Sequence, residues 1–140
     1  MLVSSLFVIS CGNEDKTGSS SDSGQSSDLS TSSDLGATYS GTWNFTGELD
    51  KETLKINTDG SCIMANVKAK TVTKNSDNNY TVVFITDVTD ATGSFTTTMT
   101  LNITFDKANS GTVKVHTIVL ENGTKNKVEN NINENIVKNN

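Results

Sequence analysis

The 140-residue chain contains no proline and no arginine, and it has a single histidine and a single tryptophan. Without proline, the chain lacks a residue that commonly protects the exposed edges of β-sheets, so lysines must serve there instead. The lone histidine, His116, lies in no motif that would place a nucleophile and an orienting acid beside it, which argues against a catalytic triad. A net charge of −5 without a basic cluster argues against nucleic-acid binding.

Motifs that hold cofactors are missing as well. No glycine-rich loop is present that could cradle a phosphate. The segment 57–60 resembles part of a calcium loop, but Lys55 and Asn66 stand where an EF-hand needs acidic ligands. Asp87 and Asp90 could join loop carbonyls around a cation, although ordinary surface carboxylates are the preferred interpretation. We therefore expect no metal, no cofactor and no enzymatic activity.

The clearest local signal is Cys11, which follows an apolar run and precedes a polar one. The segment Val8-Ile9-Ser10-Cys11 resembles the lipobox of bacterial lipoproteins. This resemblance implies that Cys11 is acylated with fatty acids such as palmitate and becomes the mature N-terminus. The protein would then be anchored to membrane lipid in the cell envelope, with the outer membrane as the expected location, facing the periplasm or the cell surface. In that case Cys62 has no disulfide partner and is a free thiol.

Residues 1–10 would then be a signal peptide. Because they contain no lysine or arginine for a positive n-region, we expect this signal peptide to be incomplete at its start. Two alternatives are a retained transmembrane anchor and a buried first strand of a soluble domain. The apolar run is too short for the roughly 20 residues of a spanning helix. The polar segment that follows it immediately favours the signal peptide over a first strand.

Residues 11–36 comprise the lipidated cysteine and a serine- and aspartate-rich segment. Positions 12–36 hold nine serines, and Leu29 and Leu35 are their only large apolar residues. Such a composition cannot bury enough apolar surface to offset the entropy of ordering the chain, so we expect a disordered tether. Its repeated Ser-Ser-Asp triplets indicate a low-complexity expansion.

Alternating apolar and polar residues dominate positions 37–123. The alternation is most regular over 95–105, where one face is apolar and the other is threonine and asparagine. Asp59-Gly60 and Asn122-Gly123 are turn dipeptides that often join antiparallel strands. The pattern predicts an all-β antiparallel domain of six to seven strands, either a small barrel or a β-sandwich. The Asn/Lys-rich tail 124–140 could form a last strand or a short helix, since its apolar residues lie four apart.

The triplet Gly41-Thr42-Trp43 resembles the Gly-x-Trp start of lipocalins and related calycin barrels. In those folds the tryptophan plugs the closed end of the barrel, which implies a core role for Trp43. The combination with Asn/Lys-rich strands and no arginine is similar to small lipoproteins of AT-rich bacteria, spirochaetes among them. If a lipocalin-like calyx is present, its candidate lining residues lie on one face of the 95–105 strand: Phe95, Met99, Leu101 and Phe105.

Two functions follow from these patterns. The first is a lipid-anchored envelope lipoprotein that presents a small β module for binding an envelope or host protein. The alternative is a lipocalin-like carrier of a small apolar ligand. A cavity of roughly 300 Å³ or more would favour the carrier, whereas a filled core would argue against it.

Overall fold

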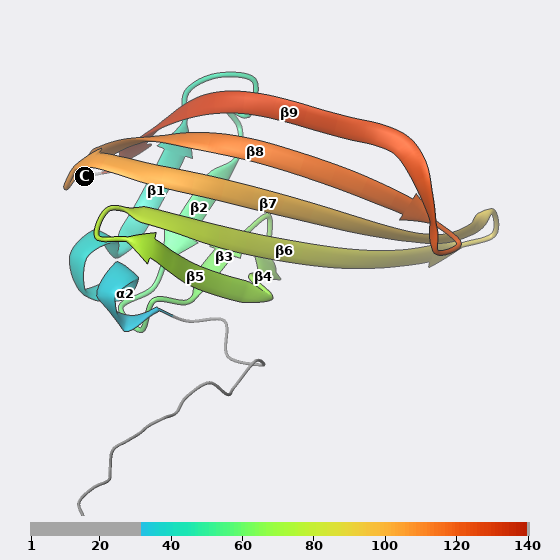
Figure 1. The fold of residues 1–140 in the computed structure, drawn as a ribbon, viewed down its shortest axis with the longest axis horizontal. Helices are drawn as coiled ribbons and strands as arrows, with labels where there is room; N and C mark the ends of the chain where they lie inside the picture. The colour runs from blue at the N-terminus through green and yellow to red at the C-terminus, as the bar shows by residue number, and fades with distance from the viewer. Residues whose placement is uncertain (1–31, 140) are drawn as a thin grey trace, which may run out of the picture.

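The computed structural model describes residues 32–139, apart from the side chains of 124–128. Its main feature is one antiparallel sheet of nine strands, in the order β4-β3-β2-β1-β9-β8-β7-β6-β5, which curls into a half-barrel (Figure 1). The predicted all-β, barrel-like class is therefore confirmed, but the sheet has nine strands where six to seven were expected. The expected signal peptide, the candidate lipidation site Cys11 and the expected tether up to residue 31 lie outside the described residues.

The strands fall into a short and a long group. Helix α2, the first described element, spans Ser33–Tyr39. The short strands are β1 (Gly41–Phe45), β2 (Thr53–Ile56), β3 (Cys62–Met64), β4 (Val67–Lys68) and β5 (Thr71–Ser76). The long strands are β6 (Asn79–Asp90), β7 (Gly93–Lys107), β8 (Ser110–Glu121) and β9 (Thr124–Lys138). The long strands extend well beyond the short ones, so part of their inner face has no strand opposite it (Figure 1).

The curl of the sheet is imposed where the chain passes from β4 to β5. These strands form opposite edges of the sheet, yet only Ala69 and Lys70 separate them. The Ala69 amide donates to the Cys62 carbonyl of β3 at 2.8 Å, and the Lys70 amide donates to the Val83 carbonyl of β6 at 2.6 Å. Because these two consecutive residues form hydrogen bonds with β3 and with β6, the two edges of the sheet must meet at this point.

Inward-facing side chains of the long strands form the core. On β7, Leu101, Ile103 and Phe105 are at most 1% exposed, while Asn102 between them is exposed. This period of two matches the alternation predicted for 95–105 and lies within β7. Burial of each such side chain contributes about 1.5–3 kcal/mol to the free energy of folding.

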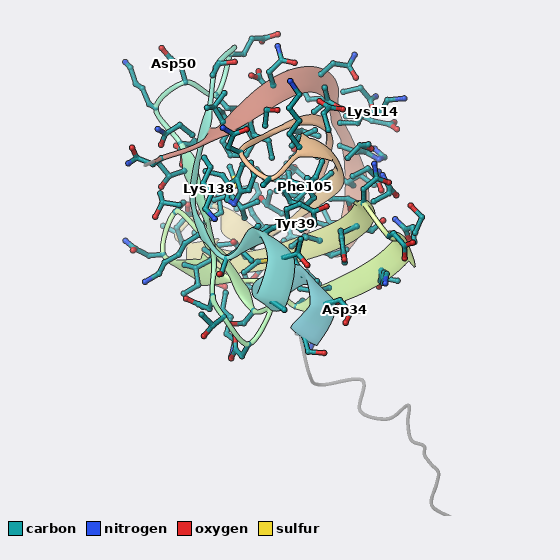
Figure 2. All side chains as sticks on the ribbon, turned by 90° about the vertical axis from the view of Figure 1, so that its left-hand side faces the viewer. Asp34, Tyr39, Asp50, Phe105, Lys114 and Lys138 are labelled. Atoms are coloured by element: carbon teal, nitrogen blue, oxygen red, sulfur yellow. The ribbon has the colours of Figure 1, made fainter. Side chains whose placement is uncertain are left out.

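Aromatic rings fill one end of the half-barrel. The rings of Tyr39 and Phe105 stack with their centroids 3.8 Å apart, and the Trp43 ring lies 4.9 Å from that of Phe105 (Figure 2). The fully buried Trp43 donates its indole N–H to the Tyr39 carbonyl at 2.9 Å, so its polar atom is satisfied. Trp43 therefore occupies a core position, as the Gly-x-Trp resemblance implies.

The ordered domain begins earlier than expected. Residues 33–36 were assigned to the tether, but they form the first turn of α2. Leu35 is fully buried, and Gly36 packs so closely on Thr58 and Gly60 that a Cβ atom would collide with their backbone. One apolar side chain and one glycine thus fix a segment whose average composition is typical of disorder.

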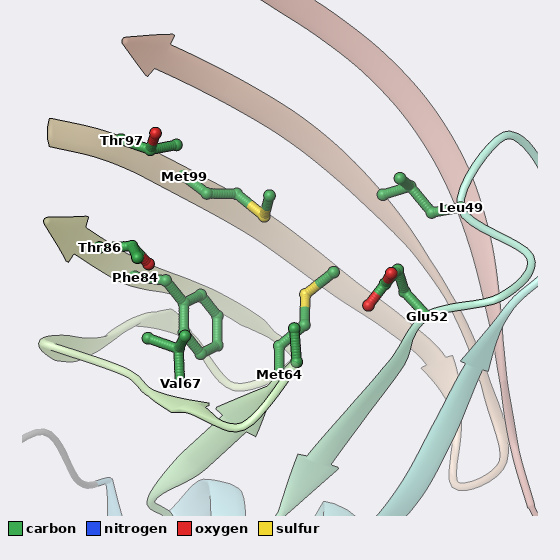
Figure 3. A pocket seen from close by; sticks show the side chains of 9 residues that line it. Leu49, Glu52, Met64, Val67, Phe84, Thr86, Thr97 and Met99 are labelled. Atoms are coloured by element: carbon green, nitrogen blue, oxygen red, sulfur yellow. The ribbon is translucent and has the colours of Figure 1, made fainter. Parts of the chain in front are cut away.

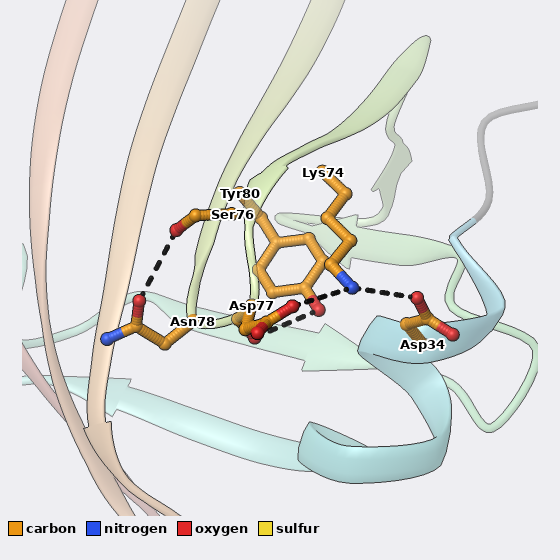
Figure 4. A network of polar contacts seen from close by, with 6 residues as sticks. All are labelled: Asp34, Lys74, Ser76, Asp77, Asn78 and Tyr80. Carbon is orange, nitrogen blue, oxygen red and sulfur yellow. Dashed lines mark hydrogen bonds and ion pairs between the residues drawn. The ribbon is translucent and has the colours of Figure 1, made fainter.

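A polar network also ties α2 to the hairpin between β5 and β6 (Figure 4). The Lys74 ammonium lies 3.0 Å from the Asp34 carboxylate of α2 and 3.3 Å from that of Asp77. Hydrogen bonding to Asp34, and then to Asp77, raises the pKa of Lys74. The three side chains are exposed, so the network orients the helix more than it stabilises it. Residues 74–79 are polar throughout, and 74–76 of them belong to β5.

For the tail 124–140, a last strand or a short helix was expected. Residues 124–138 form a strand, β9, which belongs to the sheet and pairs with β8 on one side and with β1 on the other. Ile132 and Ile136 both face the core. Their spacing of four residues fits a helical turn, but it also fits a strand because four is a multiple of two. Pairing with two neighbouring strands decides between the two conformations.

The packing of α2 predicts a measurable effect of Leu35→Ala. Removing a fully buried leucine side chain should lower the free energy of unfolding by about 2–5 kcal/mol in urea denaturation. The exposed neighbour Thr38→Ala should change it by less than about 0.5 kcal/mol. Equal, small effects of both changes would mean that α2 does not pack on the sheet.

Candidate functional site

An apolar pocket lies in the half-barrel, beside the part of the long strands that has no strand opposite it. Its volume is about 220 Å³. The lining side chains come from the β1–β2 loop, the β3–β4 turn and the inner face of β6 and β7 (Figure 3). They are Leu49, Glu52, Met64, Ala65, Val67, Phe84, Thr86, Thr97 and Met99.

Two methionines face each other across this pocket. Met99 projects from β7, and Met64 projects from the end of β3, so that both side chains point into the same space (Figure 3). Ala65 and Asn66, with φ of 50° and 66°, form the tight turn that returns the chain to Val67. Methionine side chains are unbranched and polarisable, so they adapt to apolar groups of different shape.

The buried carboxylate of Glu134 fixes the β1–β2 loop, which forms one side of the pocket. Glu134 of β9 is only 4% exposed, and its Oε1 accepts hydrogen bonds from the amides of Glu48 at 2.6 Å and Leu49 at 3.3 Å. Gly47 lies directly against this carboxylate, where any Cβ atom would collide with it. Among the described residues, Glu134 Oε2 has no hydrogen-bond partner. Glu134 therefore positions the loop that carries Leu49 and Glu52 to the pocket.

The structure separates the four candidate lining residues of the 95–105 strand. Met99 lines the pocket. Leu101 and Phe105 lie in the packed core, at 0% and 1% exposure. Phe95 lies further along the same face of β7, is partly exposed and does not line the pocket. The candidate lipidation site, Cys11, lies outside the described residues.

The side of the pocket formed by β3, β4 and the turn between them was not predicted, because the sequence favours a different strand register there. By itself, the period-two spacing of Ile63, Ala65, Val67 and Ala69 favours one strand across 63–69 with these residues facing inward. The structure instead has two short strands separated by a turn, and Met64 faces the core while Ile63 is only partly buried. The positive φ angles of Ala65 and Asn66 cause this shift, and no glycine in the sequence marks the turn.

Other polar groups considered from the sequence lie on the outer face or in turns. His116 Nε2 lies 3.2 Å from Glu129 Oε1, and both side chains are partly exposed. Asp87 accepts a hydrogen bond from the Thr96 hydroxyl at 2.6 Å, whereas Asp90 accepts from Thr92, which lowers the pKa of Asp90. In the part of the chain that the structure describes, no three His, Cys, Asp or Glu side chains gather as a metal site.

Within residues 32–139, no helix is long and apolar enough to cross a membrane. The described cysteine, Cys62, is a buried free thiol whose Sγ lies 3.8 Å from the Gly60 carbonyl oxygen. Burial, reinforced by the charge of Asp59, raises the pKa of Cys62 to about 12. Because the thiolate is the reactive form of cysteine, Cys62 is inert in the folded protein and has a packing role.

Titration of Cys62 predicts a loss of stability in alkaline solution. Above its ordinary pKa of about 8.5, the thiol ionises in the unfolded chain but stays protonated in the folded one until about pH 12. The unfolded state then binds fewer protons, so the free energy of unfolding falls as the pH rises. Between pH 8 and 10.5 the wild type should lose about 2 kcal/mol more than Cys62→Ala in urea denaturation. Parallel losses in both proteins would contradict this assignment.

Comparison with known proteins gave no match: no protein-family model, no curated protein and no solved structure is similar to this chain at a significant level. The chemistry of the site is therefore argued from its own residues. They form an apolar pocket with two facing methionines, one lining carboxylate and a loop that a buried glutamate holds.

Proposed function

We propose that this chain is a binding module of the bacterial envelope, held at a membrane by lipid on Cys11, whose half-barrel binds a small apolar group. The observation that carries this proposal is the pocket between Met64 and Met99. Its occupant is an apolar side chain of an envelope or host protein, or a free molecule of similar size.

The volume of the pocket supports a small occupant. A closed apolar cavity of about 150 Å³ is large enough for benzene, whereas pockets that enclose whole ligands measure about 300–1,000 Å³. At about 220 Å³, this pocket fits one ring or one branched side chain. The inner face nearer the aromatic end is filled by Leu101, Phe105 and Trp43. These features favour a binding module over a lipocalin-like carrier that encloses its cargo.

The chemistry of the lining supports the same choice. Eight of the nine lining residues are apolar or threonine, and Glu52 is the one charged residue among them. A carboxylate at the side of an apolar pocket disfavours anionic ligands and attracts a group with a nearby positive charge. A neutral or basic partner therefore suits the site better than a fatty acid.

The proposed anchor is compatible with this role. Helix α2 begins at Ser33, so the segment between Cys11 and the domain is residues 12–32. A flexible serine/glycine-rich chain of this length has a root-mean-square reach of about 25 Å. A domain attached in this way could meet partners beyond the lipid headgroups, in the periplasm or at the cell surface of the outer membrane.

Indole binding tests the pocket. We expect indole to shift the methyl resonances of Met64 and Met99 in protein labelled at its methionine methyl groups, because both side chains line the site. The indole N–H resonance of Trp43, which is fully buried and does not line the pocket, is the internal control. Met99→Trp should lower the affinity at least tenfold because the larger side chain fills the space. Unchanged methionine resonances at millimolar indole would overturn the proposed pocket function.

Incorporation of radioactive palmitate tests the anchor. In bacteria that express the full-length protein, the wild type and Cys62→Ala should take up label and remain with the membrane fraction. Cys11→Ser should lose the label and appear in the soluble fraction, because the sulfur to which the lipid would be attached is absent. Equal labelling of Cys11→Ser and wild type would refute lipidation at this residue.

A further inference from the structure

One edge of the long sheet is paired over only part of its length. Strand β5 pairs with β6 from Asn79 to Val83, and the Lys70 amide closes the pairing at Val83. Beyond this point the chain leaves toward β4. Among the described residues, no strand pairs with the outer side of β6 from Phe84 to Asp90.

The hydrogen-bond pattern shows which residues of β6 face this edge. The Asn78 carbonyl accepts from Phe105 of β7, whereas the Val83 carbonyl accepts from Lys70 on the other side. Because pairing alternates along an antiparallel strand, odd-numbered residues of β6 direct their N–H and C=O groups away from β7. The free amides and carbonyls are therefore those of Ile85, Asp87 and Thr89, and no proline or lysine interrupts this segment.

The free edge and the pocket belong to the same strand. The side chains of Phe84 and Thr86, which alternate with the free backbone groups, line the pocket. Val67 of β4 lines the facing wall. Val88, the next inward-facing residue of β6, is 51% exposed and extends the apolar surface. A strand added to this edge would place alternate side chains on the inner side of the sheet, at the mouth of the pocket.

We propose that the β6 edge at Ile85–Thr89 binds an extended basic segment of a partner protein by strand addition, with one apolar side chain of that segment in the pocket. This inference rests on the proposed pocket function and names its partner. Strand addition supplies backbone hydrogen bonds for affinity, while the pocket selects the side chain.

Charge favours a basic segment over a second copy of this chain. Asp87 and Asp90 lie on the free part of β6 and Glu52 lines the pocket, against Lys68 on β4. Two copies that paired through the whole free edge in a two-fold arrangement would place Asp87 opposite its symmetry mate. Like charges directly opposite each other destabilise a strand pair. Lysines two residues before and after an apolar residue lie on the same face of a strand, so they would complement Glu52 and Asp90 on the inner side of the sheet.

The test uses the peptide acetyl-Lys-Thr-Phe-Thr-Lys-amide and the full chain. Peptide binding should slow hydrogen exchange at the amides of Ile85 and Thr89. Asp87→Ala removes the carboxylate and its hydrogen bond from Thr96 but keeps the outward-facing amide, so it should weaken binding about threefold. Asp87→Pro also removes the outward-facing amide, which an edge position tolerates, and should weaken binding at least tenfold more than Asp87→Ala. The pair Thr89→Pro and Thr89→Ala repeats the comparison at the next outward-facing residue.

Indole affinity measured in every variant separates misfolding and failure of the pocket from failure of strand addition. A proline variant that binds indole like the wild type but loses the peptide supports the proposal. If the proline and alanine variants bind the peptide equally, or if the wild type binds indole but not the peptide, strand addition is overturned while the pocket function stands. A wild-type dimer that Asp87→Pro dissolves would assign the edge to a second copy and also overturn the proposal.

Discussion

The two-residue connection between β4 and β5 is the constraint on which the rest of this structure depends. Nine antiparallel strands could form an open sheet, but Ala69 and Lys70 bond to β3 and β6 in succession and bring the two edges together. The inner face becomes concave as a result, and its apolar side chains can contact one another across the half-barrel. The same connection places the β3–β4 turn opposite β6, which creates the facing walls of the pocket.

The difference in strand length determines which part of this concave face is packed and which part forms the pocket. Where short strands lie opposite the long ones, the interior is filled, and the rings of Tyr39, Trp43 and Phe105 leave no space for a ligand. Where the long strands continue alone, the inner face changes from fully buried Leu101 to partly buried Met99. The pocket lies at this transition, so packing and binding use successive positions of the same strand.

From the sequence we could predict the period-two pattern of β7, the turn at Asp59-Gly60 and the core position of Trp43, because each depends on local chemistry. It did not indicate that Gly36 packs on the turn near Gly60, since this contact joins a serine-rich segment to a distant part of the sheet. The strand β9 was ambiguous because its apolar spacing fits two conformations. Of the pocket residues, only Met99 was predicted, because Met64 reaches the site through a turn with positive φ at Ala65 and Asn66, and alanine rarely adopts this conformation.

The division of the pocket between sheet and connections bears on how its selectivity can evolve. Phe84 and Met99 belong to long paired strands: Phe84 pairs with β7, and Met99 is paired with both β6 and β8, so exchanging them disturbs the scaffold. Leu49 and Glu52 belong to a loop that one buried carboxylate, Glu134, holds through two backbone amides rather than through side chains. Mutations at those two positions can therefore alter which molecules are accepted while the anchoring point stays the same. Protein engineers could therefore randomise Leu49 and Glu52 while the strand residues that form the rest of the pocket stay unchanged.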